Sequence, residues 1–434
     1  MKQAVIIDCV RTPIGRAHAE VGFFRDVRSD DLAVSCVKTL VERTGIDPAE
    51  IEDVVMGNSQ QTAEQGVNVA RMIGLMAGLG VQASGTTVNR LCGSSLQALN
   101  QAVHSIRAGC EDVHIVGGLE HMHHVPMDHG IDINTRLFQH TSRAALLMGV
   151  TAEFLAQSQG ISRQEQDEFA LASHHKAVAA HEAGWFEKEI VPIYGKNAEG
   201  ERIQVDRDQS VRTDTDMEKL SALKPAFMPG AGTVTAGNSS PTNDGAAAML
   251  VMSEEKASQL GLEPIARVRS TAVAGVEPAL MGTGPVPATT RALERAGVGL
   301  KDIDLVELNE AFSAQSIACL RMLDLDVGKV NVRGCLHLKS AVTALTEDTL
   351  IINPDWVVAD HFPGRTCIQV DPSEPNAANV LRVGDTILFA ASFPLTGNRL
   401  ASAGFEVRPV DTSELAKAEG ALTCCSLLFD SAAV

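Results

Sequence analysis

Short apolar runs alternate with longer amphipathic stretches along the first part of the chain. Residues 4–7, 54–56 and 113–116 have the length and continuous apolar character of buried strands, whereas residues 31–43 and 94–108 have the length of helices. Strands that alternate with helices are typical of a layered α/β fold with a largely parallel sheet. The pattern therefore predicts that fold class.

The pattern changes between residues 118 and 229. Histidines cluster at residues 121–124, and charged helical segments follow, among them residues 162–183. Ser162 and Glu165 have the spacing of a capping box, which predicts that this helix begins there. We interpret the stretch as an insertion or a lid-like subdomain.

The α/β pattern returns at residues 246–252 and 265–273, and the last hundred residues or so differ again. In this tail we expect short strands at residues 350–352, 386–389 and 406–410, and helical stretches at residues 376–381 and 397–403. No glycine- or serine-rich linker marks any of these transitions. Two modules, if present, would be joined without a hinge.

The composition is compatible with this architecture. The 434 residues suffice for two or three domains with buried cores. Hydrophobic residues make up 45% and aromatic residues only 4%, so the cores must be built from aliphatic side chains, which suits closely packed α/β layers. The net charge of −18 argues against binding to nucleic acid or anionic membranes, because phosphate binding requires a basic surface.

We expect a cytoplasmic protein without a membrane span. No apolar run reaches 18 residues, and the apolar run at residues 4–7 is too short, and followed too soon by Asp8, for a signal peptide. The nine cysteines are dispersed without zinc-like pairs. This dispersion predicts reduced thiols and no metal site.

Cys92 stands between a predicted strand and the helix predicted at residues 94–108. A cysteine at the start of a helix has its thiolate favoured by the helix dipole and by free backbone N–H groups. Gly93, Ser94 and Ser95 would let the chain turn tightly there. The alternative is a structural cysteine that happens to precede a helix, and composition alone favours it because buried unreactive cysteines are common.

Several motifs around Cys92 favour the catalytic interpretation. They lie at residues 7–15, 87–95, 116–122, 148–153, 162–169, 233–240 and 243–246, and in the Asn-Glu-Ala-Phe sequence at residues 309–312. Together they resemble the thiolases without a break from residue 1 to about residue 334, and most closely the bacterial 3-ketoacyl-CoA thiolases of fatty-acid β-oxidation. Several motifs in order over that length are far more specific than any one of them.

The resemblance implies acyl transfer in which Cys92 takes up the acyl group as a thioester. It implies that Asn309 holds a water that stabilises a developing oxyanion, and that Met148, Phe227 and Ser240 line the pantetheine channel. Without the resemblance, these three would be interpreted as a core methionine, a core aromatic residue and a turn serine. The resemblance also implies acyl-CoA and coenzyme A as substrates, no separate cofactor, a homo-oligomer, and a β-oxidation complex as partner.

Two thiolase motifs, Gly-His-Pro and Cys-x-Gly-x-Gly, are absent from the sequence. Residues 330–334 lead toward the first, but His337 comes four residues too early. Residues 335–340, 350–354 and 413–427 instead resemble the C-terminal part of dimethylarginine dimethylaminohydrolases. That resemblance implies Cys424 as nucleophile and His337 as acid and base; the alternatives are a strand histidine and one of two adjacent cysteines in a C-terminal strand.

The expected fold is therefore α/β: a thiolase-like layered α/β fold with a truncated C-terminal domain, and a short α/β tail like the amidinotransferase propellers. We expect the thiolase N-terminal domain at residues 1–118 and 246–264, a loop domain at residues 119–245, the truncated C-terminal domain at residues 265–334 and a dimethylargininase-like fragment at residues 335–434. Such incomplete parts would leave apolar surface and strand edges uncovered.

We interpret the chain as a fusion whose thiolase activity is severely impaired, because losing one member of a catalytic set commonly lowers the rate by several orders of magnitude. Two alternatives remain open. One is hydrolysis of dimethylarginine by Cys424 and His337, and the other is a non-catalytic binding or assembly protein.

Overall fold

The computed structural model describes residues 2–325 and 342–410, apart from residues 347, 355, 356, 358, 360, 361, 363, 384 and 385. The chain divides into two compact units. The first unit comprises Met1–Leu323 and the second unit comprises Asp324–Val434.

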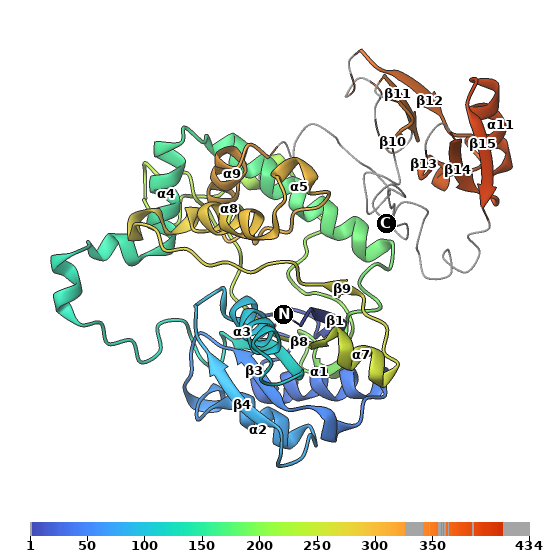
Figure 1. Ribbon diagram of the computed structural model, residues 1–434. Coiled ribbons are helices and arrows are strands. Elements are labelled where there is room, and N and C mark those ends of the chain that lie inside the picture. The colour runs from blue at the N-terminus through green and yellow to red at the C-terminus, as the bar shows by residue number, and fades with distance from the viewer. Residues whose placement is uncertain are drawn as a thin grey trace. The chain divides into compact units, whose positions relative to one another are not determined.

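The first unit is built on a seven-stranded sheet (Figure 1). Its strands are β1 (Ala4–Arg11), β2 (Gly15–Arg16), β3 (Asp53–Gly57), β4 (Ser84–Val88), β5 (Val113–His121), β8 (Asn243–Ser253) and β9 (Ala266–Arg267). They lie in the order β4-β3-β5-β8-β1-β9, and β2 pairs with β8.

The sheet is mixed, so the prediction of a largely parallel sheet is wrong. Strands β4, β3 and β5 are parallel, whereas β8 is antiparallel to both β5 and β1, and β9 is antiparallel to β1. The chain leaves the sheet at His121 and returns at Asn243 beside the strand it left. That return runs back along β5 and needs no helical crossover of the kind that joins parallel neighbours.

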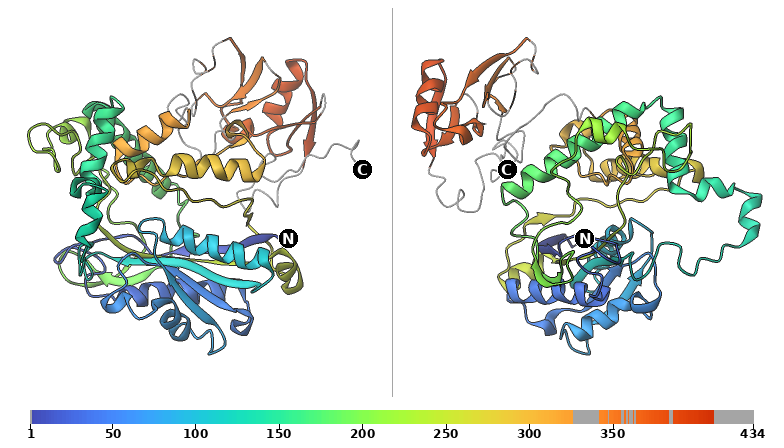
Figure 2. Two further views of the ribbon diagram at one scale, coloured as in Figure 1. Left: turned by 60° about the vertical axis from the view of Figure 1, so that its left-hand side comes forward. Right: turned by 180° about the vertical axis from the view of Figure 1, so that it is seen from behind.

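Successive strand residues point to opposite faces of the sheet, and helices cover both faces (Figure 2). These helices are α1 (Ser29–Thr44), α2 (Val69–Met76) and α3 (Ser94–Ala108). On β3, Val54 and Met56 belong to the hydrophobic core that includes α1 and α2, whereas Val55 belongs to the core on the α3 side. The helices and strands predicted for this layer are confirmed.

Helices of the insertion and two later helices form a second group beside the sheet layer (Figure 1). The remaining elements of the first unit are α4 (Met148–Ser158), α5 (Arg163–Glu182), the hairpin β6 (Ile193–Lys196) and β7 (Arg202–Val205), α6 (Met217–Ser221), α7 (Glu254–Leu260), α8 (Pro285–Ala296) and α9 (Ser313–Met322). Ser162 caps α5 by accepting a hydrogen bond from the backbone N–H of Glu165 at 3.2 Å, as predicted. The Glu165 carboxylate pairs with Arg321 of α9.

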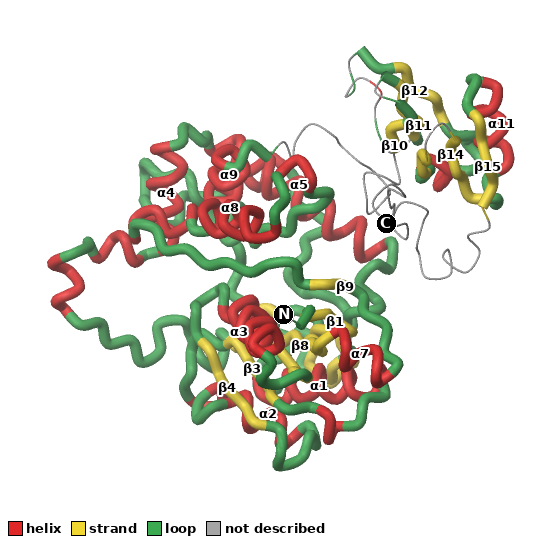
Figure 3. Tube along the Cα trace, in the orientation of Figure 1, coloured by secondary structure: helices red, strands yellow, loops and turns green. Residues whose placement is uncertain are grey.

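The segment after β9 differs from the expected return of the α/β pattern. Its strand is limited to Ala266–Arg267, and no further strand follows it among the described residues of the first unit (Figure 3). Helix α8 buries none of its residues, and Leu305 is 68% exposed and Val306 41% exposed. The apolar surface that we expect a truncated domain to leave uncovered stays a prediction here, because the residues that follow this segment lie outside the described part of the chain.

The second unit contains two three-stranded sheets and one α-helix among its described residues. The elements are β10 (Val342–Ala344), β11 (Thr349–Ile352), β12 (Thr366–Gln369), β13 (Leu381–Val383), β14 (Thr386–Ala390), α11 (Pro394–Ser402) and β15 (Glu406–Val410). In each sheet an antiparallel pair is followed by a parallel third strand. The three strands predicted for the tail are confirmed.

One predicted helix of the tail is wrong. Residues 375–378 form a short 3₁₀ turn, and Leu381 begins strand β13, where it pairs with Leu388 of β14. Pairing with a neighbouring strand overrides the local helical preference of this short segment. The other predicted helix is confirmed as α11, which begins earlier, at Pro394, a residue suited to the first helical turn. Within the described parts of the chain, every helix is too short or too polar to cross a membrane.

Candidate active site

Cys92 lies at the carboxyl end of the parallel part of the sheet. Strands β3 and β4 end at Gly57 and Val88, and the chain that follows them emerges at the same edge. Cys92 follows β4 and directly precedes Gly93, the N-cap residue of α3. Its side chain is exposed, so it is not a buried structural cysteine. This edge is where open α/β sheets bind their ligands.

The turn before Cys92 is strained and is held by side-chain hydrogen bonds. Leu91 has a φ of 47°, in the left-handed region, which costs a residue with a side chain about 1–2 kcal/mol. Oδ1 of Asn89 accepts a hydrogen bond from Leu91 N at 2.8 Å. Oγ of Ser94 accepts one from Arg90 N at 2.8 Å and donates one to Leu91 O at 2.6 Å. These bonds fix the backbone on both sides of the strained residue.

Two glycines let α3 begin in direct contact with the sheet. A Cβ added to Gly57 would lie 2.3 Å from the backbone of Ser94 and of Ser95. A Cβ added to Gly118 would lie 2.0 Å from Oγ of Ser95. The N-terminus of α3 is therefore fixed against the ends of β3 and β5. Its free N–H groups and its dipole make the position of Cys92 favourable for negative charge.

The candidate pantetheine residues lie in the helical group. Met148 is the first residue of α4 and is 40% exposed, and Phe227 is 42% exposed, so neither is a core residue. A Cβ on Gly149 would lie 2.2 Å from the ring of Phe227, so the glycine lets that ring lie against α4. The Phe227 ring meets Phe312 edge to face, with 5.9 Å between the ring centroids.

The turn that carries Ser240 is bonded to the segment that carries Asn309. Ser240 N donates a hydrogen bond to Ala311 O at 2.9 Å, and Ser313 N donates one to Asn238 O at 2.9 Å. Asn309 itself is exposed and lies two residues before Ala311. Segments that are far apart in the sequence therefore meet here.

A buried carboxylate holds the beginning of the same turn. Glu153 on α4 accepts hydrogen bonds from Thr233 N at 2.8 Å, Thr233 Oγ1 at 3.1 Å and Val234 N at 3.0 Å. Asn238 donates a hydrogen bond to Oδ1 of the buried Asp167 at 2.9 Å. A buried carboxylate is stable where several donors surround it, so this polar cluster fixes the turn.

The described contacts thus bring Phe227 together with the segments that carry Met148, Ser240 and Asn309. No hydrogen bond among the described residues links this group directly to Cys92. His337 and Cys424 lie outside the described residues.

Comparison with known proteins identifies the family. Models of the thiolase N-terminal domain and of the thiolase C-terminal domain match residues 4–255 and 262–336. The chain belongs to the thiolase family. The resemblance predicted from the motifs is thereby confirmed over these residues, whereas the assignment of the tail to the dimethylarginine dimethylaminohydrolases stays a prediction.

Named thiolases resemble this chain over most of their length. A 3-ketoacyl-CoA thiolase of Shewanella loihica is 53% identical over 338 residues, which are 77% of this chain and 87% of that protein. One of Aliivibrio fischeri is 52% identical with the same coverage. Human mitochondrial 3-ketoacyl-CoA thiolase superimposes with a TM-score of 0.68 at 35% identity, and a Bacillus anthracis acetyl-CoA acetyltransferase with 0.67 at 39%. Each superposition covers 75% of this chain and 84% of the other.

The sequence patterns did not indicate the polar residues that support the site of this thiolase. Asn58, Ser59 and Glu120 lie at the ends of β3 and β5, and Glu153 lies on α4. A signal for the first three was present in the sequence, because each is a polar residue at the end of an apolar run. Their partners are distant in the sequence, so their bonding could not be read from the pattern.

The predicted histidine cluster lies where the insertion leaves the sheet. His121 and Asp244 face each other at the paired ends of β5 and β8, with 3.3 Å between Nδ1 and Oδ1. Burial lowers the pKa of His121 and raises the pKa of Asp244. His124 stacks on His121 with 3.8 Å between ring centroids and contacts Glu64. The cluster therefore holds together the ends of β5 and β8, between which the insertion begins and ends.

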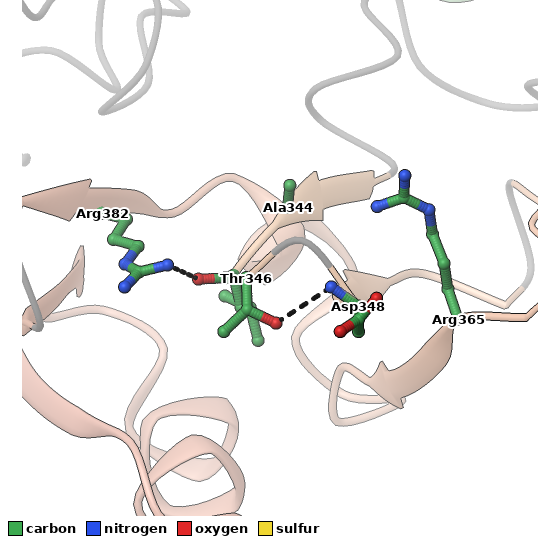
Figure 4. A pocket seen from close by; sticks show the side chains of 6 residues that line it. Ala344, Thr346, Asp348, Arg365 and Arg382 are labelled. Atoms are coloured by element: carbon green, nitrogen blue, oxygen red, sulfur yellow. Dashed lines mark hydrogen bonds between the residues drawn. The ribbon is translucent and has the colours of Figure 1, made fainter.

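The second unit has a concave region of about 680 Å³ (Figure 4). It is lined by Ala344, Leu345, Thr346, Asp348, Arg365 and Arg382. Arg382 donates a hydrogen bond to Leu345 O at 3.0 Å, and Asp348 N donates one to Oγ1 of Thr346 at 3.2 Å. None of these described lining residues is a cysteine or a histidine, and the predicted His337 and Cys424 lie outside the described residues.

Proposed function

We propose that this chain performs acyl transfer of the 3-ketoacyl-CoA thiolase type, with Cys92 as the nucleophile. The observation that carries the proposal is the exposed Cys92 on a strained turn at the start of α3. The similar proteins of Shewanella loihica and Aliivibrio fischeri are 3-ketoacyl-CoA thiolases, which supports the choice of substrate.

The proposed reaction has two steps. In the first, the Cys92 thiolate adds to the C3 carbonyl of a 3-ketoacyl-CoA, and the bond between C2 and C3 breaks. The electron pair of that bond goes to C2, which takes up a proton and leaves as acetyl-CoA, while the shortened acyl group stays on Cys92 as a thioester. In the second, the thiolate of a free coenzyme A attacks the thioester and the Cys92 thiolate leaves.

The other candidate residues have supporting roles in this proposal. Asn309 would hold a water that stabilises the oxyanion formed in each step. Met148, Phe227 and Ser240 would line the channel for the pantetheine arm. The contacts of Phe227 with the start of α4 and with Phe312, and the hydrogen bond from Ser240 to Ala311, support this assignment.

We further infer that turnover is severely impaired. The sequence lacks the Gly-His-Pro histidine, which would activate the nucleophile, and the second cysteine, which would move the proton on C2. Proton transfer by a positioned group commonly contributes 10²- to 10⁴-fold to a rate. We therefore expect this chain to retain a single acylation of Cys92 while its repeated catalytic turnover is largely lost.

We assign domains on the same basis. Residues 1–118 and 246–264 would form the thiolase N-terminal domain, residues 119–245 the loop domain, and residues 265–334 a shortened C-terminal domain. Residues 335–434 would form a separate fragment joined to it. Association into a homo-oligomer and with a β-oxidation complex forms part of the proposal.

The experiment combines mass spectrometry with a turnover assay. After incubation with acetoacetyl-CoA, the intact protein should gain the mass of one acetyl group, and Cys92→Ala should gain none. Steady-state thiolysis should fall several orders of magnitude below that of a complete thiolase. An unmodified Cys92 would refute the acyl-enzyme, and turnover at the rate of a complete thiolase would refute the impairment.

A second candidate function is hydrolysis of dimethylarginine by Cys424 and His337. The favouring observation is the order β13-β14-α11-β15, a ββαβ arrangement of the kind that the resemblance of the tail implies. Citrulline release that disappears in Cys424→Ala would support it, and no release would count against it. A monodisperse oligomer in size-exclusion chromatography with light scattering, without either activity, would favour a binding or assembly protein.

A further inference from the structure

A polar residue lies at the end of each of the three parallel strands at the edge where Cys92 lies. Asn58 follows β3, Asn89 follows β4, and Glu120 is the last residue but one of β5. Strands β4, β3 and β5 are adjacent and parallel, so the three side chains emerge at the same sheet edge. Ser59, next to Asn58, lies between the other two in the hydrogen-bond network.

Glu120 is the acceptor at the centre of this network. One carboxylate oxygen accepts hydrogen bonds from Ser59 N at 2.9 Å and from Ser59 Oγ. The other accepts hydrogen bonds from the side-chain amides of Gln65 at 2.8 Å and Asn58 at 3.3 Å. Both amide groups belong to buried residues. A single carboxylate thus fixes the loop after β3 from two sides.

The network continues from that loop to the turn that presents Cys92. Ser59 O accepts a hydrogen bond from the side-chain amide of Asn89 at 2.9 Å. Oδ1 of the same Asn89 accepts the hydrogen bond from Leu91 N. Leu91 is the strained residue, with a φ of 47°, directly before Cys92. Each link is a direct hydrogen bond, so the path from Glu120 to the strained backbone is continuous.

We propose that Glu120 is a positioning residue for Cys92. Through Ser59 and Asn89 it holds Leu91 in the left-handed conformation and so fixes the direction in which the thiol points. The role as a positioning residue for acyl transfer rests on the proposed function, but the hold on the turn does not. Glu120 itself touches no reacting atom.

The chemistry of the network explains why a carboxylate is required. All groups bonded to Glu120 are donors, and an ionised carboxylate is an acceptor only. A glutamine there has one carbonyl oxygen, and its NH₂ group would face donors. Strain at a leucine in the left-handed region corresponds to a factor of about 5–30 in population. Release of the turn should therefore lower the reactivity of Cys92 about tenfold, equivalent to about 1.4 kcal/mol.

The experiment compares two cysteines within one protein. Cys92 and Cys110 are both exposed, and Cys110 lies beyond the far end of α3. Native protein is treated with iodoacetamide, and the two rates are measured by peptide mass spectrometry, so that Cys110 serves as the internal reference. Glu120→Gln is expected to lower the ratio of the Cys92 rate to the Cys110 rate about tenfold. Acetylation of Cys92 by acetoacetyl-CoA should fall by a similar factor.

Two more variants still test the proposal if Glu120→Gln folds poorly. Asn89→Ala changes an exposed side chain and removes the last hydrogen bond of the path, the one to Leu91 N. It should lower the ratio of the Cys92 rate to the Cys110 rate by the same factor. The double variant should again lose about tenfold rather than a hundredfold, because both residues act through one path. Glu42→Gln is the matched control, since Glu42 is an exposed carboxylate on α1 that belongs neither to the network nor to the sequence neighbours of either cysteine, and it should leave the ratio unchanged.

Each outcome decides the proposal. A lower melting temperature in Glu120→Gln with an unchanged reactivity ratio would mean that the residue is only structural, and would overturn the proposal. Additive losses in the double variant would overturn the path through Asn89. If the parental protein takes up no acetyl group while Glu120→Gln still lowers the alkylation ratio, the proposed function fails and the hold on the turn stands.

Discussion

The contact between α3 and the sheet predicts a large effect of Gly57→Ala. The added Cβ would lie 2.3 Å from the backbone of Ser94 and Ser95, about 1.1 Å inside the 3.4 Å at which ordinary contact begins. Backbone atoms in a helix turn cannot rotate away as a side chain can. The start of α3 must therefore move by roughly 1 Å, and Cys92 with it.

The effects of Gly57→Ala on stability and on the reaction rate can be estimated separately. Overpacking of this kind lowers the free energy of unfolding by about 1–3 kcal/mol, and each kcal/mol lowers Tm by about 2–4 °C in a domain of a few hundred residues. A displacement of about 1 Å at a reacting group can lower a rate about 100-fold. We therefore expect a modest loss of stability together with a large loss of Cys92 acylation.

The assay measures Tm by calorimetry and the rate of Cys92 acetylation by intact-protein mass spectrometry. Gly275→Ala is the matched control, because a Cβ there meets nothing within 4 Å and the residue does not have a positive φ. Gly57→Ala with the parental Tm and the parental acetylation rate at Cys92 would show that α3 is not packed against β3 as described, and the reasoning would fail.

Three further outcomes follow from buried polar groups. Glu153→Ala leaves the buried Val234 N–H and two donors of the half-buried Thr233 unpaired and should lower the free energy of unfolding, measured in urea, by about 2–5 kcal/mol; an unchanged midpoint would contradict this. Iodoacetamide at pH 8 should label the exposed Cys92 but not Cys36, because burial raises the pKa of the Cys36 thiol to about 12; labelled Cys36 in native protein would count against the fold. Burial raises the pKa of Asp208. The hydrogen bonds and the ion pair with Arg11 together lower that pKa by a larger amount, so the net shift is downward. That pair therefore contributes stability above the ordinary carboxyl pKa of about 3.9 and loses it as the pH falls toward the folded value. Urea midpoints should consequently fall less on acidification in Arg11→Met than in the parent, and an equal fall would refute the assignment.

Sequence patterns predicted the elements here better than their connections. Helix α3 and strand β15 begin and end where the pattern places them, because turn residues and apolar runs mark their limits locally. The direction of β8 could not be predicted, since an apolar run has the same appearance whether it enters a sheet parallel or antiparallel. The helix predicted over residues 376–381 failed because pairing between β13 and β14 is a tertiary effect.

The same distinction holds for the site. Cys92 was identified by the family motifs around it, because its position between a strand and a helix would by itself have favoured a structural cysteine. Glu120 was not, because its bond to Ser59 joins residues that are 61 positions apart. Motifs made of neighbours along the chain point to the group proposed to react, but not to the groups that hold it in place.

The two halves of the proposed machinery are supported unequally. Cys92 is held by the sheet, through glycine contacts and side-chain hydrogen bonds on both sides of its turn. Asn309 is held from its downstream side, where Ala311 and Phe312 contact the turn of Ser240 and the ring of Phe227. On its upstream side, Leu305 and Val306 are exposed. The oxyanion-stabilising water proposed at Asn309 would therefore be less rigidly held than the nucleophile. Since stabilisation of developing charge depends on preorganised groups, the rate of both proposed steps should be limited by the hold on Asn309 rather than by the position of Cys92.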